Sequence, residues 1–162
     1  MASRTSSFRD SIPAPLRSIA VGTGVGFFIG GGFHLIAGTA LRFAGRATLT
    51  PSVIWNQAGP ASVRLAGVFA TYTALRGLLR EGIGASDSLA SALAGGSVVA
   101  AVTSGSSSRM DLVRASLTRA LGPRFGAIAI PKHLILASAF ASGVCTLAGA
   151  DLLVLKTINL RW

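Results

Sequence analysis

Side chains that could carry out chemistry are few in this chain, and they lie far apart in the sequence. There are two histidines, His34 and His133, and one cysteine, Cys145. A metal site needs several such ligands converging at short spacings, which these three residues do not have. The serines are not accompanied by a G-x-S-x-G motif or by a positioned His and Asp. We therefore predict that the protein is not an enzyme and holds no metal and no cofactor.

Asp151 is the acidic residue that could serve transport. It interrupts an apolar run, and an acid near or inside a membrane is costly unless it reaches water or a partner. The alternative, which we prefer, is a carboxylate at a helix end near Lys156.

The segment GTGVG at residues 22–26 is superficially similar to a nucleotide-binding loop. The dinucleotide fingerprint needs glycine at its first, third and sixth positions. Counting from Gly22, the sixth position is Phe27, and no GK[ST] follows. We expect these glycines to serve helix packing instead of phosphate binding.

Residues 18–41 predict a transmembrane helix. They carry no permanent charge and are bounded by Arg17 and Arg42. A helix of roughly 20 apolar residues crosses a hydrocarbon core of about 30 Å, and basic residues suit its ends.

Small residues recur at every fourth position within this helix, which predicts a face for close helix packing. The row consists of Gly22, Gly26 and Gly30, and His34 continues it. A lone histidine in such a row is expected to face a neighbouring helix or protein as a hydrogen-bonding residue.

The composition agrees with a chain that crosses the membrane several times. Charged residues make up 12% and the mean hydropathy is +0.62, whereas soluble domains carry about 25% charged residues. Further spans are expected over 61–79, 88–108 and 132–155, and the stretch after Arg42, which contains Pro51 and Pro60, predicts a loop before the first of these. Span 61–79 crosses only if Arg64 and Arg76 snorkel or face protein. The predicted fold is an all-α membrane protein with four transmembrane helices packed through Gly, Ala and Ser.

The third and fourth spans also contain small residues at every fourth position. We predict packing through Ala92, Gly96 and Ala100 in span 88–108, and through Gly149 in span 132–155.

A short amphipathic helix is expected over 109–121, begun by Ser108 and Asp111 and ended by Gly122. It lies either in the headgroup plane or against protein, and the sequence does not separate the two.

The formal charge of +10 raises nucleic acid as a partner. The basic residues lie outside or at the ends of apolar runs, where they meet anionic headgroups, so we expect lipid and no nucleic acid. The predicted contacts to an anionic phospholipid such as cardiolipin are Arg109, Arg114, Arg119, Arg124 and Lys132.

The expected organisation is a retained N-terminal arm at 1–17, a single domain at 18–155 and a tail at 156–162. The arm is arginine-rich like a mitochondrial presequence, but Asp10 interrupts it. Pro13 and Pro15 are expected to prevent a continuous helix into the first span.

A longer motif extends over residues 66–95. Its positions are Ala66, Phe69, Arg80, Asp87 and the pair Ala94-Gly95. With the GGFHLIAG segment of the first span, the pattern resembles the mitochondrial inner-membrane preprotein and amino acid transporter family, which includes the presequence and carrier translocases. Two departures stand out: six residues separate Arg80 from Asp87 instead of three, and Val99 occupies the final glycine position.

The widened gap and the DSLASALAGG run are more similar to the family's four-helix accessory subunit of respiratory complex I (NADH:ubiquinone oxidoreductase). The resemblance implies a non-catalytic, multi-pass protein of the mitochondrial inner membrane that supports assembly and stability of the membrane arm. Its alternative is a subunit of a protein translocase or an envelope solute channel. We also expect Arg80 and Asp87 to lie near each other at a membrane boundary.

Overall fold

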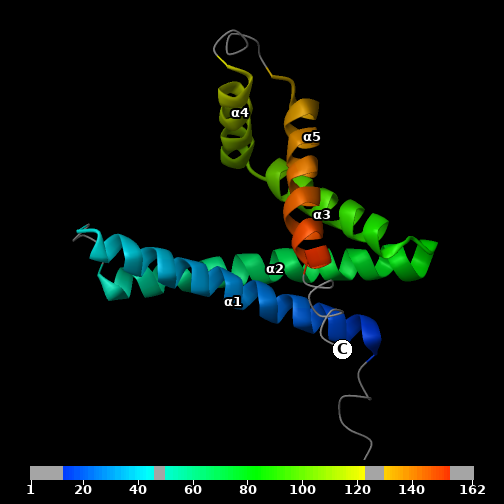
Figure 1. The fold of residues 1–162 in the computed structure, drawn as a ribbon, viewed down its shortest axis with the longest axis horizontal. Helices are drawn as coiled ribbons and strands as arrows, with labels where there is room; N and C mark the ends of the chain where they lie inside the picture. Colours follow the sequence, from blue (N-terminus) through cyan, green and yellow to red (C-terminus); the bar gives the residue numbers. More distant parts are fainter. Residues whose placement is uncertain (1–12, 46–49, 123–129, 154–162) are drawn as a thin grey trace, which may run out of the picture. The chain divides into compact units, whose positions relative to one another are not determined.

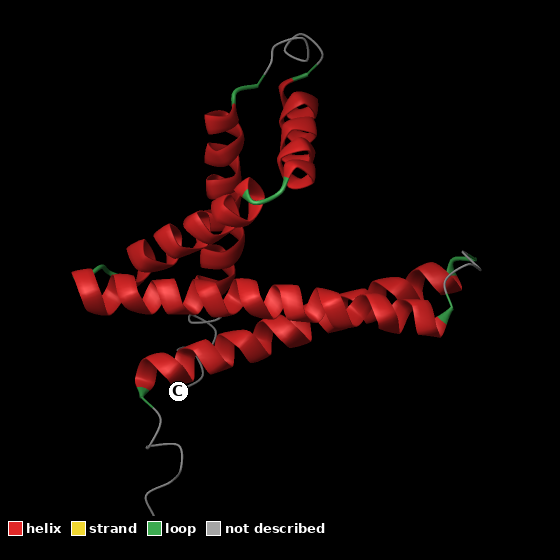
Figure 2. Cartoon of the chain, turned by 180° about the vertical axis from the view of Figure 1, so that it is seen from behind, coloured by secondary structure: helices red, strands yellow, loops and turns green. Residues whose placement is uncertain are grey.

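The computed structural model describes residues 13–45, 50–122 and 130–153. Regular structure in these segments is helical throughout (Figures 1 and 2). The elements are α1 (Ala14–Phe43), α2 (Pro51–Ile83), α3 (Asp87–Ser104), α4 (Ser107–Leu121), α5 (Lys132–Gly143) and the π-helical turn η2 (Val144–Ala148).

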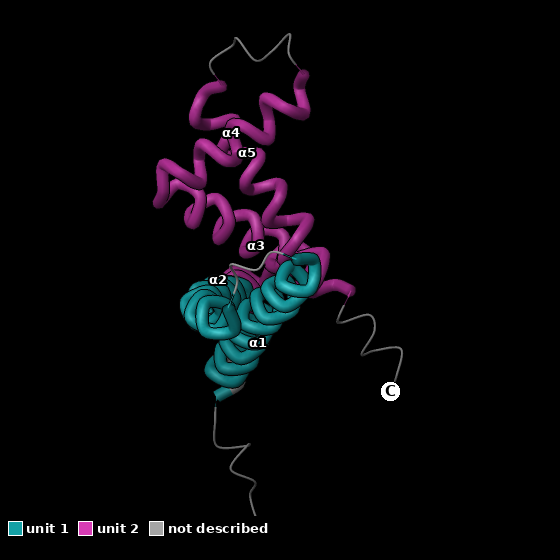
Figure 3. The backbone as a smooth tube through the Cα atoms, turned by 90° about the vertical axis from the view of Figure 1, so that its left-hand side faces the viewer, with its two compact units in different colours: residues 1–77 teal, residues 78–162 magenta. Residues whose placement is uncertain are grey.

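Helical residues 149–153 continue beyond η2. Contacts group the chain into two compact units, residues 1–77 and 78–162 (Figure 3), and α2 contributes to both. Most of the predicted arm, the tail 156–162 and Arg124 lie outside the described residues.

Two helices are long and apolar enough to cross a membrane: Leu16–Phe43 and Lys132–Leu153. Helices α3 and α4 pass the same test only as a pair, which is bent by 112° at Gly105 and Ser106. The chain therefore has two candidate spans, or three if the bent pair is one broken span. Four transmembrane helices are not confirmed.

Span 61–79 does not stand alone, because it is the central part of the 33-residue helix α2. We expected a loop before it, yet α2 begins at Pro51, and proline is tolerated in a first helical turn. The Thr50 hydroxyl accepts a hydrogen bond from the Val53 amide at 3.4 Å and so caps this start. Exposed Arg64 and Arg80 keep α2 more polar than the two candidate spans.

Pro15 likewise does not delay α1, which begins at Ala14 after Pro13 as its N-cap. Because the first-turn amides have no intrahelical acceptor, a proline there removes no helical hydrogen bond. The expectation was therefore wrong for Pro15, which lies inside the helix, whereas α1 does begin directly after Pro13.

The first unit is an antiparallel pair of α1 and α2 in close contact (Figure 1). A Cβ placed on Gly26 would lie 2.5 Å from the Leu65 carbonyl oxygen, and one on Gly30 would lie 2.8 Å from that of Ala61. Towards its ends the same face meets Thr73 at Gly22 and Ile54 at Gly38. The two backbones thus approach each other where α1 lacks side chains.

The face of α2 that contacts the glycines of α1 has its own row of buried residues, most of them small. Its buried positions Ile54, Ala58, Ser62 and Ala66 recur at every fourth residue. Ser62 stays in this interface because its hydroxyl donates to the Ala58 carbonyl oxygen at 2.8 Å. The opposite face of α1 is strongly apolar and exposed: Phe28 is 77% and Ile36 73% exposed.

The second unit is built on the contact of α3 with α5 and η2. A Cβ on Gly95 would lie 2.7 Å from the Gly143 carbonyl oxygen, and a Cβ on Gly143 would in turn clash with the Gly95 carbonyl oxygen. Gly96 is covered by the Phe140 ring, 2.5 Å from where its Cβ would be. Here, too, two helices meet backbone to backbone.

In the last span, the residues that pack against α3 are not in the row that includes Gly149. The buried residues are Ile135, Ala139, Gly143 and Ala148, and a Cβ on Gly149 would meet nothing within 4 Å. The packing role of Gly149 was therefore wrong. In α3, Gly96 is buried as expected, whereas Ala92 and Ala100 are half-buried beside a face centred on Ser91, Ala94 and Gly95.

The spacing changes from four to five residues between Gly143 and Ala148 because η2 inserts one residue into the helix. Each α-helical residue advances about 100° around the axis, so one insertion sets back every later residue by about that angle. The Thr146 hydroxyl donates to the Ser142 carbonyl oxygen at 2.8 Å and satisfies this acceptor in the irregular turn.

Replacing Gly26 by alanine tests the α1–α2 contact. We expect Gly26→Ala to destabilise the protein by about 1–3 kcal/mol, because Cβ meets backbone atoms that cannot rotate away. That corresponds to a fall in Tm of roughly 2–12 °C, measured by circular dichroism in detergent. The matched control is Gly24→Ala on the same helix, where nothing lies within 4 Å of the added atom. Equal Tm values for the two variants would contradict the contact.

Candidate functional site

All six motif residues lie at contacts within one or the other unit. In the first unit, Ala66 Cα would be 2.9 Å from a Cβ on Gly26, and the Phe69 carbonyl oxygen would be 3.1 Å from a Cβ on Gly22. In the second unit, Ala94 is fully buried and Gly95 meets Gly143. Arg80 and Asp87 form the remaining contact. The motif therefore marks packing positions and not a cluster of reactive groups.

Arg80 and Asp87 form an ion pair across the turn between α2 and α3. Arg80 Nη1 lies 3.3 Å from Asp87 Oδ1, which confirms the expectation that these residues are neighbours. The turn is closed by Gly84 with φ of +65°, a conformation that favours glycine. Ser86 caps α3 by accepting from the Leu89 amide at 3.4 Å. The six-residue gap thus holds a helix end, a glycine turn and a cap.

A double-mutant cycle with Arg80→Gln and Asp87→Asn measures this pair. Both side chains are more than half exposed, at 62% and 51%, so we expect a coupling free energy below about 1 kcal/mol that decreases with added salt. Unfolding in detergent at two salt concentrations gives the value. A coupling that is absent at low salt would show that the pair does not stabilise the turn.

Asp151 is half-buried and accepts a hydrogen bond from Ser91. Ser91 Oγ, whose residue is fully buried on α3, donates to Asp151 Oδ2 at 3.0 Å. The one-residue insertion at η2 turns Asp151 towards the face that carries Gly143 and Ala148. Asp151 is therefore more than a carboxylate at a helix end, since it joins the last helix to α3. The sequence alone does not reveal this, because residues 91 and 151 belong to different spans.

Removing the Ser91 hydroxyl tests this hydrogen bond. We expect Ser91→Ala to lower stability by about 1–2 kcal/mol, since hydrogen bonds to charged groups contribute about 1.5–3 kcal/mol and Asp151 is only half-buried. The control is Ser97→Ala, an exposed position on the same helix. Thermal unfolding of both variants decides the point, and a Ser91→Ala protein as stable as the control would remove this role.

His34 is exposed within this chain, so it is not buried between α1 and α2, and its expected contact with another protein stays a prediction. Its ring lies edge-on to that of Phe33, with centroids 6.0 Å apart. The packing row passes from Gly30 to Gly38 beyond it.

The basic residues predicted to bind lipid have different surroundings. Arg109 Nη1 donates to the Val102 carbonyl oxygen at 2.8 Å, so it links α4 to the last turn of α3 across the bend. Arg114 pairs with Asp111 at 3.0 Å. Arg119 and Lys132 are exposed, and neither forms an ion pair with another described residue. Helix α4 also starts two residues earlier than predicted, because its N-cap is Ser106 instead of Ser108.

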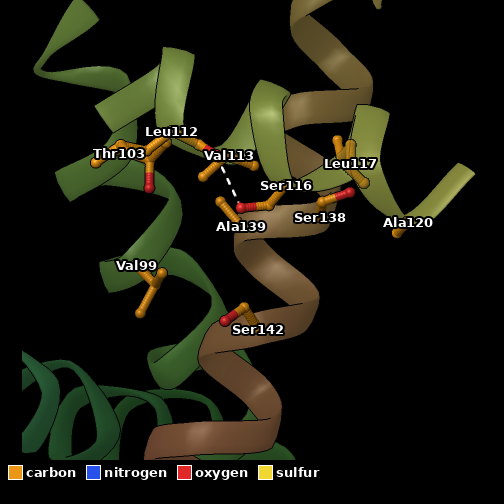
Figure 4. A pocket seen from close by; sticks show the side chains of 10 residues that line it. All are labelled: Val99, Thr103, Leu112, Val113, Ser116, Leu117, Ala120, Ser138, Ala139 and Ser142. Atoms are coloured by element: carbon orange, nitrogen blue, oxygen red, sulfur yellow. Dashed lines mark hydrogen bonds between the residues drawn. The ribbon is translucent and has the colours of Figure 1, made fainter. Parts of the chain in front are cut away.

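A groove of about 420 Å³ lies between α3, α4 and α5 (Figure 4). Apolar side chains including Val99, Val113 and Leu117 line it together with four hydroxyl residues: Thr103, Ser116, Ser138 and Ser142. The Ser116 hydroxyl donates to the Leu112 carbonyl oxygen at 2.9 Å, so it is satisfied within its own helix. Small-molecule sites have volumes of about 300–1,000 Å³, so the groove is large enough for a ligand.

The groove has no titratable side chain in its lining, so its chemistry is that of an apolar binding site with a few hydroxyls. Among the residues that the structure describes, no three His, Cys, Asp or Glu side chains gather as metal ligands. The groove was not predicted from the sequence, because its presence depends on the 112° bend between α3 and α4.

Comparison of this chain with family models, curated proteins and solved structures finds no match.

Proposed function

We propose that this chain is a non-catalytic accessory subunit of a large membrane assembly. Its role is structural: it supplies packed helices and the surface that these helices present. The apolar helices indicate a membrane protein. The observation that carries the proposal is the position of the motif: all six of its residues lie in helix contacts or in the Arg80–Asp87 turn. Residues used in this way stabilise a scaffold.

The surface available for such an assembly is apolar. On α1, the large side chains on the face away from α2 are exposed, among them Phe28 at 77% and Ile36 at 73%. A membrane subunit contacts lipid or neighbouring subunits with surfaces of this kind. The Thr23 hydroxyl on the same helix is satisfied locally, because it donates to the Ile19 carbonyl oxygen at 2.8 Å.

The resemblance over residues 66–95 selects the first assembly to test, which is complex I of the mitochondrial inner membrane. A protein translocase or solute channel of the same family is the second candidate. Asp151 favours this alternative, because a half-buried acid in a candidate span is a common element of transport paths.

Native electrophoresis of mildly solubilised membranes separates the two. We expect the full chain to migrate with complex I subunits, and we expect Gly26→Ala to reduce the incorporated fraction more than Gly24→Ala does. Migration with a translocase would favour the second candidate. Migration as a free protein, apart from any large complex, would contradict the accessory role.

A further inference from the structure

The groove between α3, α4 and α5 has a basic end. Helix α4 ends at Leu121 and α5 begins at Lys132, so the end of α4 and the start of α5 lie at the same end of this helix pair (Figures 1 and 2). Arg119 is in the last turn of α4, next to Ala120 of the groove lining. Lys132 precedes the lining residue Ser138 by six residues, or about 9 Å along the helix.

Basic residues outnumber acids on the described helices beside the groove. Helix α4 and the start of α5 carry Arg109, Arg114, Arg119 and Lys132 against one acid, Asp111, which is paired with Arg114. Arg119 and Lys132 remain exposed. Each basic residue near a membrane surface attracts anionic lipid by about 1 kcal/mol, which corresponds to about a five-fold change in affinity.

Exposed apolar side chains also lie near the two cations in sequence. Leu121 is 52% exposed and follows Arg119 by two residues, and Leu134 is 51% exposed and follows Lys132 by two residues. Inside the groove, Val99 and Val113 supply apolar contact further from the cations. A largely apolar groove between two helices whose adjacent ends carry cations matches a molecule with a hydrocarbon chain and an anionic headgroup.

We propose that this groove holds an acyl chain of an anionic phospholipid, with the headgroup at Arg119 and Lys132. This inference requires that the chain be a membrane protein, but it does not depend on which assembly contains it. The lipid fills the space that the bend between α3 and α4 opens beside α5.

Native mass spectrometry of the full chain in mild detergent tests the site with three probes. These are dioleoyl-phosphatidylglycerol, its dihexanoyl analogue and dioleoyl-phosphatidylcholine. We expect the long-chain anionic lipid to bind at least about five-fold more tightly than either of the others, because only it supplies both the chain and the charge. Equal affinity for the three lipids would overturn the proposal.

Ser138→Phe fills the groove, and Ala137→Phe is its matched control, because Ala137 is exposed on the same helix and does not line the groove. We expect Ser138→Phe to weaken binding of the dioleoyl anionic lipid at least about five-fold and Ala137→Phe to leave it unchanged. If Ser138→Phe fails to fold, Ser142→Leu narrows the same groove. A folded groove-filling variant with wild-type affinity would refute the site.

Arg119→Gln and Lys132→Gln test the headgroup, against Arg64→Gln as an equal loss of charge elsewhere. We expect each of the first two to weaken binding about five-fold and the control to have no effect. Conversion of a dimer to a monomer by Ser138→Phe, with lipid binding unchanged, would show that a second copy occupies the groove instead. Lipid binding is read on the isolated chain, so its failure is distinct from failure to co-migrate with an assembly.

Discussion

Both units depend on the close approach of helix backbones at glycine. Between Gly26 and Leu65, and between Gly95 and Gly143, the contacting atoms belong to the main chain and no side chain could be repacked to admit another atom. Inside a bilayer, lipid tails are as apolar as the protein, so burial of apolar side chains does not hold two helices together. Van der Waals contact at short range does, and it requires small residues.

Polar groups in these helices are tied to nearby acceptors. Ser62 and Thr73 donate to carbonyl oxygens of their own helix, and Ser91 donates to Asp151. Because an unsatisfied hydroxyl is costly away from water, such hydrogen bonds allow serine and threonine to occupy small-residue interfaces. The interfaces can therefore be polar in composition and still be suited to a membrane.

Regular spacing made part of this structure predictable. The row Gly22, Gly26, Gly30 lies in one uninterrupted α-helix, so its period reports one face directly. The proximity of Arg80 and Asp87 also follows from sequence, because a short turn with Gly84 separates them. One prediction that was wrong concerns a position where regularity fails, because Gly149 lies beyond the inserted residue of η2. His34 continues the glycine row but is exposed within this chain.

Other features were beyond prediction because they depend on partners distant in sequence. Helix α2 was interpreted as a loop and a short span, since Pro51 and Pro60 are common loop residues, yet the buried Ile54 and Ala58 extend its packing face through that region. The groove exists because α3 and α4 diverge by 112°, and Arg109 holds that bend through the Val102 carbonyl oxygen. No single segment contains the information for either.

The π-helical turn η2 acts as a phase shift within one helix. Residues before Val144 and after Ala148 obey the same 3.6-residue period, but the two stretches are out of register by one position. Side chains on opposite sides of the turn can thus be aligned on one face although their sequence spacing is wrong for an uninterrupted helix. In this chain the shift allows the small residues of the last helix and the Asp151 carboxylate to contact the same helix, α3.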